Sequence, residues 1–204
     1  METESGSKSN GQPDLGKNDM KKLLIAAVAS TAFIATPALA DNTLTYSLDA
    51  DVGSICGVFR HNGTAYVTNV PVNFGELATT SANVPVGAGS ATYRCNNPNG
   101  FTRTISSANS GVLRRDGSAG GAANEIEFRM SHGGGSGLGF ATQTLATPKV
   151  TNLSGSTAFL AGQTGSVNFE VTGVQASLGG NQAPGTTVFA GNYTDTVTIA
   201  ITGN

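Results

Sequence analysis

In DNTLTYSLDADV, residues 41–52, polar and apolar side chains alternate without a break from Thr43 to Val52. One face of an extended chain would carry the five apolar members, Leu44, Tyr46, Leu48, Ala50 and Val52. Such strict alternation is typical of a half-buried β-strand. The stretch stands ahead of the first cysteine, near an end where chains usually fray. What its apolar face packs against is therefore the question that decides the fold.

The residues just before this stretch have the pattern of a secretory signal peptide. Met20, Lys21 and Lys22 are followed by an apolar run of about thirteen residues and by a small-residue ending at Ala40. The run is shorter than the roughly 18 residues of a membrane span, and no later segment approaches that length. We therefore predict a signal peptide at 20–40, cleavage after Ala40 and an exported chain. Residues 1–19 are interpreted as an upstream extension or a tag.

The remaining chain of about 164 residues is long enough for one domain with a real core. From residue 41 onward it has one Lys and six Arg against five Asp and four Glu, spread without blocks. This balance gives no indication of a nucleic-acid surface. A charge-poor chain rich in Thr, Ser, Asn and Gly, without Trp, is typical of an extracellular β-protein.

Cys56 and Cys95 are the two cysteines of the chain. An oxidising compartment favours pairing them, and the resulting loop would contribute about 4 kcal/mol in the chain-entropy model. A metal site or redox pair would need CxxC-like spacing or nearby histidines, which are absent from the surrounding sequence. We therefore predict a structural disulfide, with no metal or cofactor.

No sustained helical periodicity follows Ala40, and turn residues separate a series of short apolar runs. The predicted strands are Ile55–Phe59, Ala65–Phe74, Ser90–Cys95, Phe101–Ser106, Ile126–Met130, Leu138–Leu145, Thr157–Leu160, Ser166–Val174 and Tyr193–Thr202. Many short strands at this spacing indicate an all-β sandwich.

The last of these strands contains TDTVTIAIT, residues 194–202. Val197, Ile199 and Ile201 would point to one side of it, and Thr196, Thr198 and Ala200 to the other. A strongly amphipathic strand is therefore expected near each end of the exported chain.

Several stretches together resemble the pilin subunits of the archaic chaperone–usher pathway, grouped with spore coat protein U. The alternating segment is followed closely by Ser54-Ile55-Cys56, and Val72-Asn73-Phe74-Gly75 lies between the cysteines. Ala91-Thr92-Tyr93-Arg94-Cys95 closes the pair, and the run from Ala190 to Ile199 is similar to the family's C-terminal motif. The resemblance covers essentially the whole exported chain and is most specific at its two ends.

The resemblance implies an incomplete immunoglobulin-like β-sandwich, residues 54–204, that lacks its last strand and leaves an apolar groove open. A periplasmic chaperone fills such a groove first, and at the outer-membrane usher the N-terminal segment of the next subunit replaces it. Residues 41–53 would be this donor strand, a known mode of strand addition. Val197, Ile199 and Ile201 would border the groove and pair with the chaperone.

On this hypothesis the apolar face of residues 41–53 belongs in a neighbour's groove. Burying its four large side chains would contribute on the order of 6–12 kcal/mol gross. Two alternatives remain: the segment folds back onto its own sheet as a first strand, or the C-terminal strand is an ordinary interior strand of the sandwich.

Other candidate sites are weaker. His61 and His132 are the two histidines, and no GxSxG nucleophile motif accompanies them. Asp49 and Asp51 lack the carboxylate that an EF-hand loop needs at its twelfth position, where Arg60 stands. The glycine-rich run Gly133–Gly139 lacks the Lys-Ser/Thr of a phosphate-binding loop and is left without an assigned role.

We therefore expect a non-enzymatic pilus subunit for surface attachment and biofilm formation, with related subunits, a chaperone and an usher as partners. A self-contained secreted β-sandwich that binds a ligand such as carbohydrate is the alternative, although the absence of Trp counts against sugar stacking. A small exported hydrolase is a third possibility.

Overall fold

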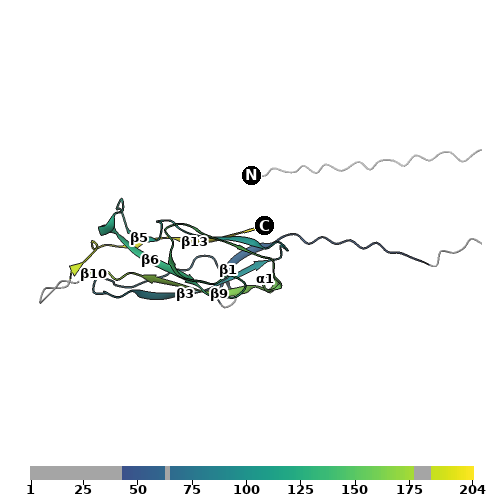
Figure 1. Ribbon diagram of the computed structural model, residues 1–204, viewed down its shortest axis with the longest axis horizontal. Helices are drawn as coiled ribbons and strands as arrows, with labels where there is room; N and C mark the ends of the chain where they lie inside the picture. The colour runs from purple at the N-terminus through teal and green to yellow at the C-terminus, as the bar shows by residue number, and fades with distance from the viewer. Residues whose placement is uncertain (1–42, 63–64, 177–184) are drawn as a thin grey trace, which may run out of the picture. The chain divides into compact units, whose positions relative to one another are not determined.

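The structure is a computed structural model that describes residues 43–62, 65–176 and 185–204, without the side chains of 61, 62, 65 and 66. The chain divides into two units, residues 1–49 and residues 50–204. The second unit is shown in Figure 1 and carries the strands described below. The predicted signal peptide and its cleavage site lie outside the described residues. Within them, no helix is both long enough and apolar enough to cross a membrane.

The regular secondary structure of the second unit is almost entirely β-strand. The strands are β1 (Cys56–Asn62), β2 (Ala65–Val67), β3 (Val84–Cys95), β4 (Phe101–Ser107), β5 (Val112–Arg115), β6 (Glu125–His132), β7 (Phe140–Thr144), β8 (Lys149–Leu153), β9 (Gln163–Val171), β10 (Gln175–Ala176), β11 (Gly185–Thr186), β12 (Tyr193–Thr194) and β13 (Val197–Gly203). Two short helical turns accompany them, η1 (Ala122–Asn124) and α1 (Thr157–Ala161).

These strands form two antiparallel sheets packed face to face. The larger sheet has the order β12-β5-β6-β9-β3-β1-β2, with β7 paired to β6, and the smaller one has the order β13-β4-β8. A separate small ribbon joins β10 to β11. The prediction of an all-β, immunoglobulin-like β-sandwich is confirmed.

The core forms where alternate side chains of the two sheets meet. In β6, Ile126, Phe128 and Met130 are buried while the residues between them are exposed. Phe101 and Ile105 of β4 face them from the smaller sheet and are fully buried. This period of two is the direct expression of the apolar–polar alternation in the sequence.

The predicted disulfide is confirmed. Cys56 lies directly opposite Cys95 in the antiparallel ladder of β1 and β3, and their sulfur atoms are bonded. The bridge therefore ties the first strand of the sandwich to the long central strand β3.

Several predicted strands are wrong, too long or divided. The predicted strand Tyr193–Thr202 is two strands, because β12 pairs with β5 of the larger sheet and β13 pairs with β4 of the smaller one. Thr157–Leu160 forms helix α1, because the Ser156 hydroxyl caps its first turn by accepting from the Ala158 amide at 3.2 Å, while Phe159 is buried. The run Ala65–Phe74 ends as a strand at Val67. Pro71 has no amide hydrogen to donate to a ladder, and residues 68–83 cross the structure without strand pairing.

Candidate functional site

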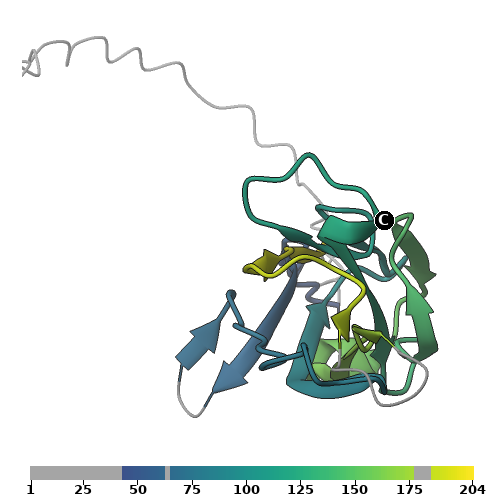
Figure 2. The same ribbon diagram turned by 90° about the vertical axis from the view of Figure 1, so that its left-hand side faces the viewer.

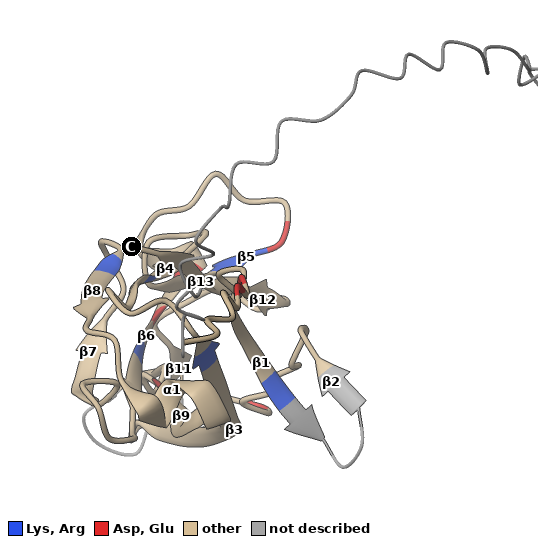
Figure 3. Ribbon diagram, turned by 90° about the vertical axis from the view of Figure 1, so that its right-hand side faces the viewer, with Lys and Arg blue, Asp and Glu red and all other residues tan. Residues whose placement is uncertain are grey.

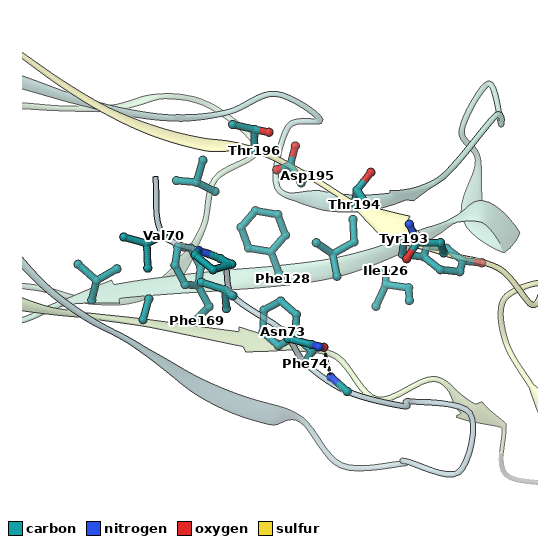
Figure 4. Close-up of a pocket in the computed structure, with 18 of the residues that line it drawn as sticks. Val70, Asn73, Phe74, Ile126, Phe128, Phe169, Tyr193, Thr194, Asp195 and Thr196 are labelled. Atoms are coloured by element: carbon teal, nitrogen blue, oxygen red, sulfur yellow. Dashed lines mark hydrogen bonds between the residues drawn. The ribbon is translucent and has the colours of Figure 1, made fainter. Parts of the chain in front are cut away.

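A large groove lies between the two sheets at the end of the sandwich away from the disulfide. Its volume is about 1280 Å³. Its lining is mainly apolar, and its apolar members include Val58, Val67, Val70, Val72, Phe74, Leu77, Ala88, Ala91, Leu113, Ile126, Phe128, Val167, Phe169, Val174, Val188, Val197 and Ile199. In Figure 4, Phe128 and Ile126 of β6 and Phe169 of β9 point into this space from the larger sheet.

One wall of the groove is β13. This strand stands at the end of its sheet and pairs only with β4 among the described strands, from Val197↔Ser107 to Gly203↔Phe101. Val197 and Ile199 are half-buried and line the groove, whereas Ile201 is half-buried but does not line it. The other edge of β13 therefore presents backbone groups beside an apolar surface.

The opposite wall consists of β1 and the segment 67–78. Side-chain caps shape this segment: Asn73 Oδ1 accepts from the Gly75 amide at 2.8 Å, and Glu76 Oε1 accepts from the Ala78 amide at 2.8 Å. They place Phe74 toward the floor of the groove (Figure 4), and Leu77 also packs against the core. Sequence reasoning missed this wall, because its alternating Val70, Val72 and Phe74 favour a strand.

The groove is closed at the disulfide end and open at the other. A Cβ atom placed on Gly203 of β13 would lie 3.4 Å from the Cys56 sulfur, so β1 and β13 nearly touch there. The lining begins two residues further on, at Val58. Figure 2 shows β1 and β2 standing away from β13 beyond that point.

The C-terminal motif holds the start of β13 in place. The Asp195 carboxylate accepts from the Ser107 hydroxyl at 2.6 Å and from the Asn109 amide at 2.9 Å. The Tyr193 hydroxyl donates to the Phe189 carbonyl at 2.6 Å. These polar contacts attach the motif to the β4–β5 connection and leave the apolar side of β13 toward the groove.

The N-terminal segment keeps its apolar face exposed. In the first unit, Leu44, Tyr46 and Leu48 are 75, 76 and 94% exposed. In the second unit, Val52 is 82% exposed. Residues 43–55 are assigned to neither helix nor strand, and Asp41 and Asn42 lie outside the described residues.

Charge is sparse on the ribbon (Figure 3), and the N-terminal segment is acidic. Asp49 and Asp51 are its charged residues between 43 and 53. No Lys or Arg stands anywhere between Lys22 and Arg60. The groove lining includes one basic side chain, Arg60, and two acidic ones, Glu76 and Asp195.

The structure describes the side chain of one of the two histidines. His132 is buried in the core, where its Nε2 atom lies 3.0 Å from the Tyr93 hydroxyl, and it does not line the groove. Burial lowers the pKa of His132. The side chain of His61 lies outside the described residues. In the part of the chain that is described, no three or more His, Cys, Asp or Glu side chains gather as a metal site would require.

The glycine-rich run Gly133–Gly139 is the connection from β6 to β7. The Gly133 amide donates to the Ser166 carbonyl at 2.8 Å, and Leu138 is fully buried. The run therefore packs against β9 and contributes to the core, away from the residues that line the groove.

Comparisons with known proteins give one structural similarity. No family model and no curated protein matches the sequence. Among solved structures, the fold is similar to a chain of a chaperone–tip adhesin complex of CFA/I fimbriae, with a TM-score of 0.42 and 12% sequence identity. The similarity covers 73% of this chain and 42% of that chain, so this chain spans less than half of the other's length.

Proposed function

We propose that this protein is a pilus subunit that polymerises by donor-strand exchange, with residues 41–53 of one copy filling the groove of the next. One observation carries the proposal: the same chain presents an exposed alternating apolar segment and an apolar groove beside an open strand edge. Each of these features alone would favour aggregation in water. Together they are complementary.

The dimensions and chemistry of the two parts agree. Leu44 to Val52 is nine residues, enough to pair along the seven residues of β13 with its apolar face turned inward. Backbone hydrogen bonds to the open edge of β13 would add roughly 0.5–1.5 kcal/mol each to the burial of the large side chains. The joint between two subunits is then very long-lived.

The occupant of the groove is a second copy of the chain. A segment given by one molecule and a groove offered by the next make a heterologous contact, which does not close on itself and so builds a fibre. Before assembly, the open groove needs a temporary partner that covers it. We propose a periplasmic chaperone for this role, an outer-membrane usher for the exchange, and a structural, non-catalytic role in surface attachment and biofilm formation.

Deletion of residues 41–53 tests the proposal. The exported chain, co-expressed with its chaperone, is expected to give ladders of denaturant-resistant species on a gel run without boiling. The deleted chain should give only the single-subunit species, because its groove is intact but it has no segment to give. Ladders that persist after the deletion would refute donor-strand exchange.

A matched pair of substitutions isolates the apolar face of the segment. Leu48→Asp places a carboxylate on the face that enters the groove, and we expect it to abolish the ladders. Ser47→Asp adds the same charge at the neighbouring position on the opposite face and should leave them intact. Equal loss in both variants would mean that charge, and not apolar burial, governs assembly.

A further inference from the structure

The root of the N-terminal segment, residues 53–55, is held by one residue, Asn96. The Ile55 amide donates to Asn96 Oδ1 at 2.6 Å, and Asn96 Nδ2 donates to the Gly53 carbonyl at 2.8 Å. The Asn96 amide also donates to the Ile55 carbonyl at 3.1 Å. Asn96 therefore binds backbone groups on both sides of Ser54.

These contacts extend the β1–β3 ladder beyond its last pair. Cys56 is opposite Cys95 and joined to it, and Asn96 follows immediately on the β3 side. The disulfide fixes the first residue of β1, and the hydrogen bonds of the Asn96 side chain fix the backbone before it as far as Gly53. The segment consequently leaves the domain in a direction set by Asn96.

Apolar packing does not hold the root. The Ile55 side chain is 73% exposed, and a Cβ atom on Gly53 would meet nothing within 4 Å. Glycine is the residue with the greatest backbone freedom, so an unheld Gly53 would act as a pivot. The hydrogen bonds from Asn96 remove that freedom.

We propose that Asn96 is a positioning residue that fixes the angle between neighbouring subunits of the fibre. This inference depends on the proposed donor-strand exchange. With Val52 in the neighbour's groove and Ile55 held on Asn96, only Gly53 and Ser54 connect the two domains. The Cα atoms of Val52 and Ile55 are at most about 10 Å apart. Any movement of residues 53–55 therefore moves one subunit against the next.

Electron microscopy of isolated fibres tests the inference. Fibres of Asn96→Ala should form, because the segment and groove are unchanged, but their persistence length should fall to about half or less of the wild-type value, since the backbone regains freedom at the root. The matched control is Asn99→Ala: this residue is in the same turn, and its side chain is exposed and makes no hydrogen bond within the described part of the chain. Control fibres should be as stiff as wild type.

Hydrogen exchange on the same fibres gives a second readout. Losing the Asn96 side-chain bonds should speed exchange of the Ile55 amide by roughly fivefold to a hundredfold. Asn96→Asp keeps an acceptor for that amide but no donor for Gly53, so the Ile55 amide should remain protected. Fibres of Asn96→Ala with wild-type stiffness or an equally protected Ile55 amide would overturn the positioning role alone. Absence of fibres from the wild-type chain would overturn the proposed function and this inference with it.

Discussion

The most buried polar residues of the sandwich form a network around Tyr93. His132 Nδ1 lies 2.5 Å from the Gly133 carbonyl, which can only accept, so Nδ1 is assigned the proton and Nε2 accepts from the Tyr93 hydroxyl. The Arg103 guanidinium lies 5.7 Å from the centre of the Tyr93 ring and donates to the Leu138 carbonyl at 2.9 Å. This arrangement requires a neutral imidazole next to a buried cation.

This network predicts a loss of stability in acid. Burial lowers the pKa of His132, so the unfolded chain takes up a proton there at a higher pH than the folded chain. The contribution is fully present above pH about 6.5 and declines below it, by at most about 1.4 kcal/mol per pH unit. Urea unfolding at pH 7.5 and 5.5 should show a larger fall in the free energy of unfolding for wild type than for His132→Gln.

The disulfide predicts a second effect at the residue scale. Replacing Cys56 and Cys95 together by Ala frees β1 from β3 across a separation of 39 residues in the sequence. We expect the free energy of unfolding to fall by about 2–4 kcal/mol, measured by denaturant titration. An unchanged midpoint in the double variant would show that the β1–β3 ladder holds the strand without the bridge.

At the scale of elements, β13 presents two different faces. Ile199 faces the groove, whereas Ala200 is exposed on the outer face, opposite Thr104 of β4. A lysine at 199 would place a charge in the apolar groove, and a lysine at 200 would remain in water.

Binding of a peptide with the sequence of residues 41–53 to the chain that lacks them measures this difference. Ile199→Lys should weaken binding at least about a hundredfold, close to 2.7 kcal/mol, whereas Ala200→Lys should change it by less than about twofold. Circular dichroism of both variants checks that the sandwich is folded. Similar affinities for the two variants would exclude β13 as the wall that receives the segment.

Elements with strong alternation and clear turns were predictable from sequence. Phe101–Ser106 and Ile126–Met130 correspond to β4 and β6 within one or two residues, since local pattern and core packing agree there. Helix α1 was missed because its apolar run is too short to show a period and its capping serine was overlooked. β5 and β8 were missed because Arg114, Arg115 and Lys149 interrupt their apolar pattern.

The candidate site was predictable only in part, because some of its residues have no periodic pattern in the sequence. Both amphipathic ends, and with them Val197 and Ile199, stand out in the sequence. The wall formed by Phe74 and Leu77 depends on the turn at Asn73 and Glu76, and the role of Asn96 depends on which strand is its neighbour. Such tertiary contacts leave no periodic signal.

At the scale of the whole molecule, the proposed function gives each copy one segment to donate and one groove to fill. Two variants separate these capacities. The chain lacking residues 41–53 can only receive a segment in its groove, and full-length Ile199→Lys can only donate its segment to another groove. Each alone should remain a single subunit. Mixed together, they should form a complex with one copy of each and no longer species, as measured by size-exclusion chromatography with light scattering. Longer species in the mixture would show a second route of assembly.

The absence of basic residues from the N-terminal segment has a consequence for the proposed fibre. Trypsin-like enzymes cut after Lys or Arg, and neither occurs between Lys22 and Arg60. In the proposed fibre, the tether that passes from one domain to the next would therefore offer trypsin-like proteases no site for cleavage.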